Sequence, residues 1–225
     1  MTQTARKTKT TDDGPKRPAK DLVYDYVRGK ILNGEWRGGD FIEEKIVSDA
    51  VGVSRTPVRE ALHRLQSDHY ISLTPRRGAV VRQITAQELI EVYESRRLIE
   101  SHAMQRICQE RLPIPAILRD LYEKMCITSK SQDFVQRAEY DQAFHRNIVA
   151  TINNAVLVEL YGSLQVRQQR VAIAAMRVQP ARAETIDQEH HDLLVALENF
   201  DEEAALGIIS RHLRPVLDVV SRLPV

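Results

Sequence analysis

The strongest restriction on the fold of this chain is the helical spacing of apolar residues that continues from Thr85 to the C-terminus. In every periodic stretch of this part, apolar residues recur every three or four positions, as they do along one face of an amphipathic helix. Aromatic residues make up only 5% of the chain, which disfavours a β-sandwich or barrel. We therefore expect residues 85–225 to form an all-α antiparallel bundle, with helices near 86–111, 115–129, 131–152, 154–178, 182–199 and 202–222.

The first part of the chain follows a different order, in which glycine and proline separate short elements. The expected elements are a helix, a short helix, a tight turn, a third helix and a two-stranded hairpin, at residues 21–33, 43–50, from 54, and at 70–74 and 79–82. This is the order of a winged helix-turn-helix domain, which we place at residues 21–84. Residues 1–20 are polar and basic, and we expect them to form a disordered tail. The whole chain is thus expected to be mostly α.

The third helix of this domain has one apolar and one polar face. Its apolar face has the spacing of a buried stripe at Val58, Ala61, Leu62 and Leu65. Ser54 can cap its N-terminus, and the outer face of its first turns carries Arg55, Thr56 and Arg59. Arginine matches the O6 and N7 atoms of guanine, or phosphate groups. The alternative is that these arginines form only a solvated helix face.

The turn between the two expected strands carries further basic residues. Arg76, Arg77 and Gly78 lie at the tip of the hairpin, where they could enter a minor groove or hold the DNA backbone. Residues 1–83 carry 16 basic and 11 acidic side chains, and the remainder carries 16 and 20. This asymmetry favours a nucleic-acid contact in the first part of the chain.

Targeting signals and cysteine usage point to a cytoplasmic protein. No apolar run approaches the length of a transmembrane helix, and the polar N-terminus does not have the apolar core of a secretory signal. Cys108 and Cys126 lie far apart in helical patterns, and we expect both to be reduced thiols. We expect no membrane association.

Three histidines and one aspartate occupy positions in the bundle where apolar residues would be expected. Asp141 and His145 lie one turn apart on a stripe that also holds Ile148, and His190 and His212 lie on the stripes of two later helices. A buried carboxylate needs a partner, and one divalent metal would satisfy all four groups. The donor set suits Zn²⁺ first, with Ni²⁺, Mn²⁺ or Fe²⁺ as alternatives. From the spacing alone, a buried polar network is an equally good explanation.

Two arginines of the bundle also point inward by their spacing. Arg96 lies on the apolar stripe of the helix at 86–111, with Glu100 one turn further on. It could clamp the carboxylate of an effector beside the metal, or it could form a structural pair with Glu100. Arg167 lies between Leu164 and Val171 and is a weaker candidate for the same role.

Two stretches of the sequence resemble known families. The segment Gly52-Val-Ser-Arg-Thr-Pro-Val-Arg-Glu-Ala-Leu62 resembles the signature of GntR-type transcriptional regulators, and the Pro75–Val81 segment extends the match. In that family the residues matching Ser54, Arg55, Thr56, Arg59 and Gly78 contact operator DNA. The chain departs from the pattern at Gly38-Gly39, usually Pro-Gly, and at His69, usually glycine.

The second part resembles the FCD ligand-binding domain of the FadR subfamily. The matching residues are Asp141-Gln-Ala-Phe-His145, Asn154, Glu189-His190 and Arg211-His212, together with the motif Tyr93–Glu100. The resemblance implies that Asp141, His145, His190 and His212 bind one divalent metal per chain.

Together these features predict a transcriptional regulator, more often a repressor in this family, and not an enzyme. A homodimer would bind a pseudo-palindromic double-stranded operator, and a small carboxylate would act as effector near the metal. One alternative is a regulator with a purely structural or sensed metal and no organic effector. A remote alternative is a metal-dependent hydrolase, which the sequence does not favour because no acid–base pair or nucleophile motif accompanies the histidines.

Overall fold

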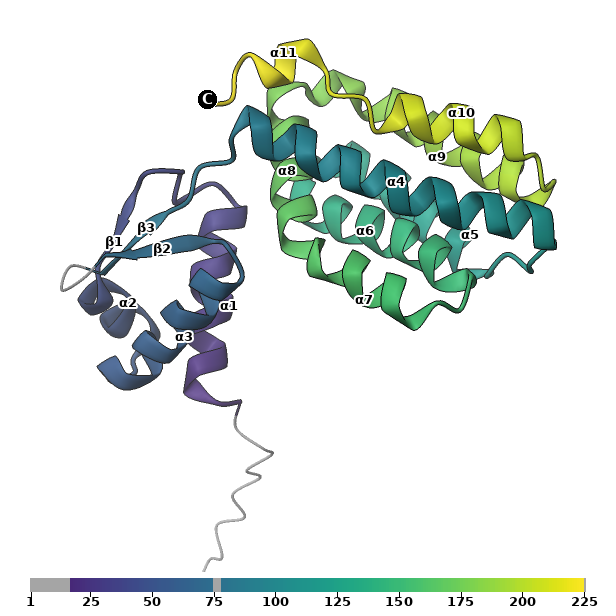
Figure 1. Ribbon diagram of the computed structural model, residues 1–225. Helices are drawn as coiled ribbons and strands as arrows, with labels where there is room; N and C mark the ends of the chain where they lie inside the picture. Colours follow the sequence, from purple (N-terminus) through teal and green to yellow (C-terminus); the bar gives the residue numbers. More distant parts are fainter. Residues whose placement is uncertain (1–16, 75–77, 225) are drawn as a thin grey trace, which may run out of the picture.

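The computed structural model describes residues 17–74 and 78–224 of the chain (Figure 1). Most of the predicted tail, together with Arg76 and Arg77, lies outside the described residues. The predicted fold class is confirmed: a small domain with three helices and a three-stranded sheet is followed by a bundle built only of helices. In the part of the chain that the structure describes, no helix combines the length and apolarity needed to cross a bilayer.

The N-terminal domain has the predicted order of elements. It contains α1 (Ala19–Leu32), β1 (Phe41–Ile42), α2 (Glu44–Val51), α3 (Arg55–Ser67), β2 (Ile71–Thr74) and β3 (Gly78–Val81). The sheet is antiparallel with the order β1-β3-β2. The predicted stripe of α3 is fully buried, since Val58, Ala61, Leu62 and Leu65 are each at most 1% exposed, and α3 packs against α1.

Local details of this domain differ from the prediction. Strand β1 is only two residues long, too short for a periodicity to indicate it. Ser54 occupies the N-cap position of α3, but its side chain accepts no hydrogen bond there. Gly78 has a φ of +116°, and a Cβ atom at this position would lie 2.3 Å from the carbonyl oxygen of Ile42. The wing therefore requires glycine at this point.

The C-terminal domain is helical throughout, as predicted. Its elements are α4 (Ala86–Glu110), α5 (Ile117–Ser131), α6 (Phe134–Thr151), α7 (Ala155–Ser163), α8 (Gln165–Val178), the 3₁₀ turn η1 (Pro180–Arg182), α9 (Ala183–Glu198), α10 (Glu202–His212) and α11 (Leu217–Val220). Thr85 caps α4 because its side-chain oxygen accepts a 3.0 Å hydrogen bond from the backbone amide of Glu88, and the sequence Thr85-Ala-Gln-Glu88 has the pattern of a capping box. Helix α6 packs against α4, α5 and α8, while α10 lies along α4 and α9 (Figure 1).

Two of the expected helices were predicted too long. The helix expected at 154–178 is broken at Leu164 into α7 and α8; Gly162 and Ser163 precede the break, and such pairs are common at sharp kinks. The helix expected at 202–222 ends at His212, because Pro215 lacks an amide hydrogen and cannot continue it. Only the short α11 follows, and Val219 still reaches the core.

The two domains contact each other mainly through α8. Arg170 donates hydrogen bonds to the backbone oxygens of His69 and Arg82, and Arg177 donates to the backbone oxygen of Leu32. Ile173, also on α8, is buried with the apolar core of the N-terminal domain. Helix α8 therefore holds the N-terminal domain at the ends of α1, α3 and β3 (Figure 1).

Candidate metal centre and DNA-binding face

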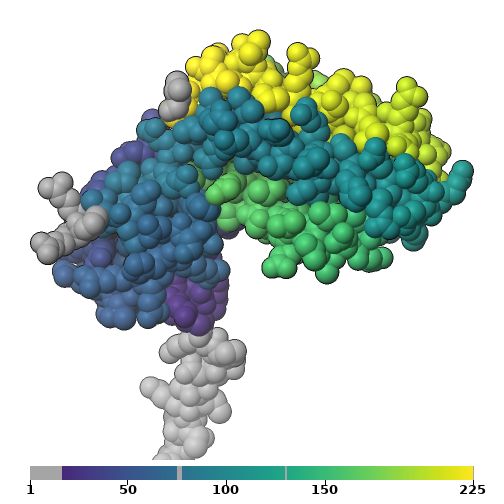
Figure 2. All heavy atoms as spheres, viewed as in Figure 1, coloured from purple at the N-terminus to yellow at the C-terminus, as the bar shows by residue number. Residues whose placement is uncertain are grey.

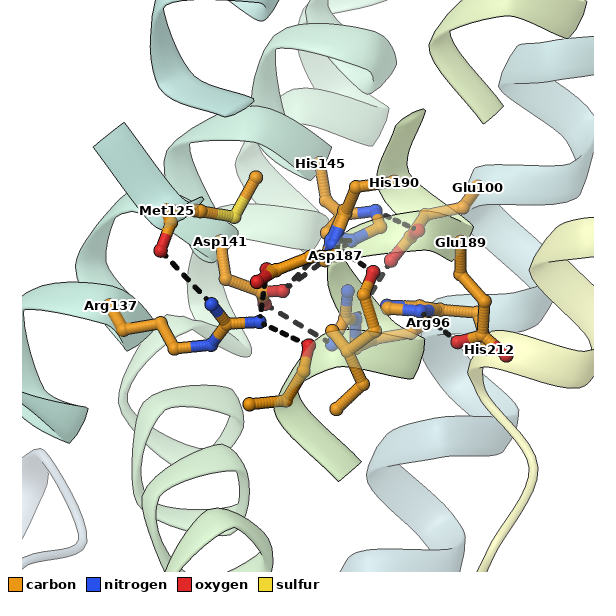
Figure 3. Close-up of polar contacts among 12 residues, drawn as sticks. Arg96, Glu100, Met125, Arg137, Asp141, His145, Asp187, Glu189, His190 and His212 are labelled. Carbon is orange, nitrogen blue, oxygen red and sulfur yellow. Dashed lines mark hydrogen bonds and ion pairs between the residues drawn. The ribbon is translucent and has the colours of Figure 1, made fainter. Parts of the chain in front are cut away.

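Asp141, His145, His190 and His212 meet at one point in the C-terminal domain (Figure 3). Asp141 and His145 come from α6, His190 from α9 and His212 from the end of α10. One ligand atom from each of the four residues lies within 4.8 Å of the others. The predicted convergence of these side chains is therefore seen in the structure.

The Nδ1 atom of each histidine faces an oxygen atom that can accept its hydrogen. His145 Nδ1 lies 2.7 Å from Oε2 of Glu100, His190 Nδ1 lies 2.8 Å from the backbone oxygen of Ile186, and His212 Nδ1 lies 3.0 Å from Oε2 of Glu189. If Nδ1 carries the proton in each ring, as these acceptors require, each Nε2 atom presents a lone pair. This is the usual outer-shell arrangement of metal-binding histidines.

In that arrangement the Nε2 atoms of the histidines and the carboxylate oxygens of Asp141 carry no hydrogen, so they cannot form hydrogen bonds with one another. His190 Nε2 lies 3.1 Å from His145 Nε2 and 3.1 Å from Oδ1 of Asp141. Lone pairs at such distances repel each other unless a cation lies between them, so the donor set fits a divalent metal. A metal-free network would require at least one ring to turn its proton toward Asp141. The four residues therefore satisfy the chemistry of a metal site.

Burial favours the neutral form of His145 and His212, which is the form that binds a metal. His145 and His190 are 0% exposed. Burial lowers the pKa of His145 and lowers the pKa of His212 to about 4. Burial raises the pKa of Asp141, but the His190 hydrogen bond and the neighbouring cationic groups outweigh it, so the net pKa lies well below its usual value. His145 and His212 are thus neutral bases near neutral pH, beside the ionised carboxylate of Asp141.

Arg96 fits both of the roles weighed for it. Its Nε atom bonds Oε1 of Glu100 at 2.8 Å, so the intrahelical pair is formed. Its Nη1 atom lies 3.9 Å from Oδ2 of Asp141, and its buried Nη2 atom has no hydrogen-bond partner among the described residues. A buried guanidinium with a free donor is costly, and it can bind an anion without breaking the Glu100 pair.

A cavity of about 60 Å³ borders this cluster, with room for a few water-sized groups. Arg96, Asp141 and His212 line it together with a second buried arginine, Arg137. The interpretation of the sequence missed Arg137, which is 3% exposed and lies 2.7 Å from Asp187. Its spacing, four residues before Asp141 on the same helix, is a signal that could have identified it.

Arg167 lies elsewhere, and so it cannot join this cavity as expected. Its Nη2 atom is 3.1 Å from Nε2 of His69, at the contact between the two domains. Arg167 does point toward other parts of the protein, as its spacing predicts. The part that covers this side of α8 is the N-terminal domain and not the bundle core.

Of the predicted DNA-contacting residues that the structure describes, four lie at the start of α3 and Gly78 lies at the start of β3. Ser54, Arg55, Thr56 and Arg59 are all exposed. Between α2, α3 and the sheet lies a cleft of about 830 Å³ whose lining includes Arg55, Arg59 and Gly78. The Arg59 Nε atom lies 3.0 Å from both carboxylate oxygens of Glu44, which fixes the guanidinium at the edge of this cleft.

Comparisons with known proteins agree with this two-part architecture. Residues 19–81 match the family model "Bacterial regulatory proteins, gntR family", and residues 91–215 match the FCD domain. The gluconate operon transcriptional repressor of Bacillus subtilis is 28% identical over 83% of this chain and 77% of its own length. The Nta operon transcriptional regulator of Aminobacter aminovorans is 26% identical, covering 82% of this chain and 88% of its own length.

Solved structures show the same fold. McbR/YncC of E. coli aligns with a TM-score of 0.68 and 25% identity, covering 88% of this chain and 94% of its own. A GntR regulator described as putative, from Rhodococcus sp. RHA1, aligns with a TM-score of 0.72 and 21% identity, covering 86% and 93%. With a winged helix-turn-helix head and an FCD domain of this size, the chain belongs to the GntR family of bacterial transcriptional regulators.

Proposed function

We propose that this protein is a repressor whose affinity for operator DNA is controlled by a small carboxylic acid bound beside a metal in the C-terminal domain. The observation that carries the proposal is the unpaired Nη2 atom of Arg96, which borders the same cavity as Asp141 and His212. A buried guanidinium next to a cluster of metal ligands provides two positive groups, the arginine and the metal, that can both bind the oxygens of a carboxylate.

The metal would be held by Asp141, His145, His190 and His212, one ion per chain, with Zn²⁺ expected first and Ni²⁺, Mn²⁺ or Fe²⁺ as alternatives. When bound, it supplies a positive centre that can accept a carboxylate oxygen of the effector. Arg96 would orient the acid and compensate its charge, while Arg137 lines the same cavity. The effector would thus contact three helices, α4, α6 and α10.

The proposed DNA-binding residues are Ser54, Arg55, Thr56, Arg59 and Gly78 at the starts of α3 and β3, with Arg76 and Arg77 outside the described residues. Exposed arginines in the first turns of α3 are placed to reach base edges or phosphates. The bound form would be a homodimer on a pseudo-palindromic operator, because two heads are needed to read two half-sites. Exposed Leu98, Val156 and Leu160 on the neighbouring helices α4 and α7 support a contact between two copies there.

The coupling between effector and DNA would run through α8. Ala172, Ala175 and Met176 of this helix line the cavity, while Arg170 and Arg177 of the same helix hold the N-terminal domain. An acid that displaces α8 would therefore shift the DNA-binding heads relative to each other. Such a shift would lower operator affinity, because the spacing of the heads must match the DNA turn.

The first experiment is a metal analysis of the purified protein, paired with a His145→Ala, His190→Ala double variant. We expect close to one metal per chain in the wild type and none in the folded variant. Fluorescence anisotropy with DNA from the upstream region of the gene then measures operator affinity with added lactate, succinate or citrate. An acid should weaken DNA binding only in the metal-loaded wild type. If neither metal nor any acid changes operator affinity, the proposal is wrong.

A second candidate is a regulator with a structural metal and no organic effector. It is favoured by the complete burial of His145 and His190, since structural sites are closed. Under this alternative, removal of the metal would unfold the C-terminal domain. Under the proposed function, the metal-free protein would stay folded and lose only its response to the acid.

A further inference from the structure

A second cavity, of about 530 Å³, lies in the groove between the two domains. Helices α6, α7 and α8 line it from one side, and Arg28 of α1 lines it from the other. Figure 2 shows the surface hollowed where the N-terminal domain meets the green helices of the bundle. None of its lining residues also lines the cavity beside the metal ligands. It is therefore a separate site.

The walls of this cavity are rich in amide side chains. Three glutamines that line it, Gln142, Gln168 and Gln169, are 7%, 3% and 3% exposed, respectively. Helix positions so deeply buried normally hold apolar residues, because a buried amide is unfavourable unless it is hydrogen-bonded. Gln142 donates to the backbone oxygen of Gln165, and Gln169 accepts from Arg28 at 2.8 Å.

Gln168 is the exception. Its Nε2 atom is buried and has no hydrogen-bond partner among the residues that the structure describes. Buried amides without partners are rare in native proteins and call for an explanation. Because Gln168 lines the cavity, a turn of its side-chain amide would present these two unpaired hydrogens to a molecule bound there.

The buried polar groups of the lining are uncharged amides, and the charged side chains lie toward the solvent. Glu139 is the one carboxylate in the lining, and it is 3.4 Å from Arg28. Arg146 is exposed at the surface. The lining contains neither histidine nor cysteine, so it does not suit a transition metal. Amides offer a donor and an acceptor side by side, and vicinal hydroxyl groups present the complementary pair.

We propose that this groove is a binding site for a neutral polyhydroxylated small molecule, a sugar or a sugar alcohol. The ligand would accept hydrogen bonds from Gln168 and contact Arg28 of the N-terminal domain at the same time. Tyr161 also lines the cavity, and its hydroxyl donates to Glu100 at 2.7 Å. Because Oε2 of Glu100 lies 2.7 Å from Nδ1 of His145, Tyr161 and Glu100 form a path of polar contacts from this cavity to the cluster described above.

The test is isothermal titration calorimetry of the full chain with D-glucose, D-xylose and D-sorbitol. We expect saturable binding of at least one of them, with one site per chain, in the presence or absence of metal. Gln168→Leu should weaken this binding at least about tenfold, since it removes the unpaired donors. Gln188→Leu is the matched control, because Gln188 is exposed on α9, and it should bind as the wild type does.

A second variant, which fills the cavity without changing Gln168, tests the proposal independently. Gly162 lines the cavity, and a Cβ atom there would meet nothing within 4 Å. Gly162→Leu should therefore fold normally and block the ligand, whereas Gly29→Leu, at an equally open helical glycine outside the cavity, should not. The proposal is overturned if none of the three compounds binds the wild type, or if one binds both Gln168→Leu and Gly162→Leu as tightly as the wild type.

Discussion

Replacing Glu100 by glutamine should destabilise the C-terminal domain strongly. The Glu100 carboxylate is 0% exposed and is within 2.8 Å of Arg96 Nε, and within 2.7 Å of both His145 Nδ1 and the Tyr161 hydroxyl. Glutamine has nearly the same shape but no charge, so it leaves Arg96 buried beside an amide. Breaking a buried ion pair by neutralising one partner costs about 3–5 kcal/mol. The carbonyl oxygen of the new amide can still accept from Tyr161, so we expect about 3 kcal/mol.

The measurement is urea denaturation followed by far-ultraviolet circular dichroism, with a chelator present so that metal does not contribute. A loss of about 3 kcal/mol should lower the urea midpoint by roughly 1 M or more. Glu110→Gln is the matched control, since Glu110 lies on the same helix and its pair with Arg106 is at the surface, where ion pairs contribute little. Equal midpoints for Glu100→Gln and the wild type would refute the reasoning.

The destabilisation caused by Glu100→Gln should depend on pH. Burial raises the pKa of Glu100, but Arg96 and His145 outweigh burial and bring the net pKa well below its ordinary value. A carboxyl whose pKa falls on folding contributes stability above its unfolded pKa, about 4.3. The difference in the free energy of unfolding between the wild type and Glu100→Gln should therefore be largest at pH 7 and should decrease as the pH falls below about 4. A difference that increases on acidification would contradict this assignment.

Three further outcomes are expected. Gly78→Val should destabilise the N-terminal domain by about 1–3 kcal/mol, seen in thermal unfolding, because φ is +116° and Ile42 leaves no room for a side chain; unchanged unfolding would contradict the wing geometry. Arg55→Ala should weaken operator binding in anisotropy titrations and, if Arg55 contacts phosphate, reduce the salt slope by about one. A chelator should lower the melting temperature of the wild type and Zn²⁺ should restore it, whereas His145→Ala, His190→Ala should respond to neither.

The sequence predicted the parts of the structure that depend on spacing within one helix. The stripe of α3 and the inward Asp141, His145 and His190 follow from helical periodicity alone, because each side chain has only one direction on a regular helix. The end of α10 could also have been read from Pro215. The break at Leu164 follows Gly162 and Ser163, a pair that indicates a kink, but the apolar periodicity by itself does not indicate it.

Other features depend on which part of the protein packs against a helix. The sequence of that helix alone does not determine its packing partner. Arg167 points inward by spacing, but the neighbour it meets is His69 of the other domain. Glu189 of α9 supplies the outer-shell acceptor for His212 of α10, and this role requires the packing of α9 against α10. Arg137 was not part of the predicted stripe, although it lies four residues before Asp141 on the same helix and lines the same cavity.

Arg170 and Arg177 hold the N-terminal domain through hydrogen bonds to its backbone oxygens, at the ends of α1 and β3 and in the segment after α3. None of these acceptors depends on a side chain of the outer face of α3. The outer face of α3 can therefore change its sequence without disturbing this attachment. Exchange of the recognition residues between members of the family should yield chimeric regulators that read a new operator while they keep the effector response of this bundle.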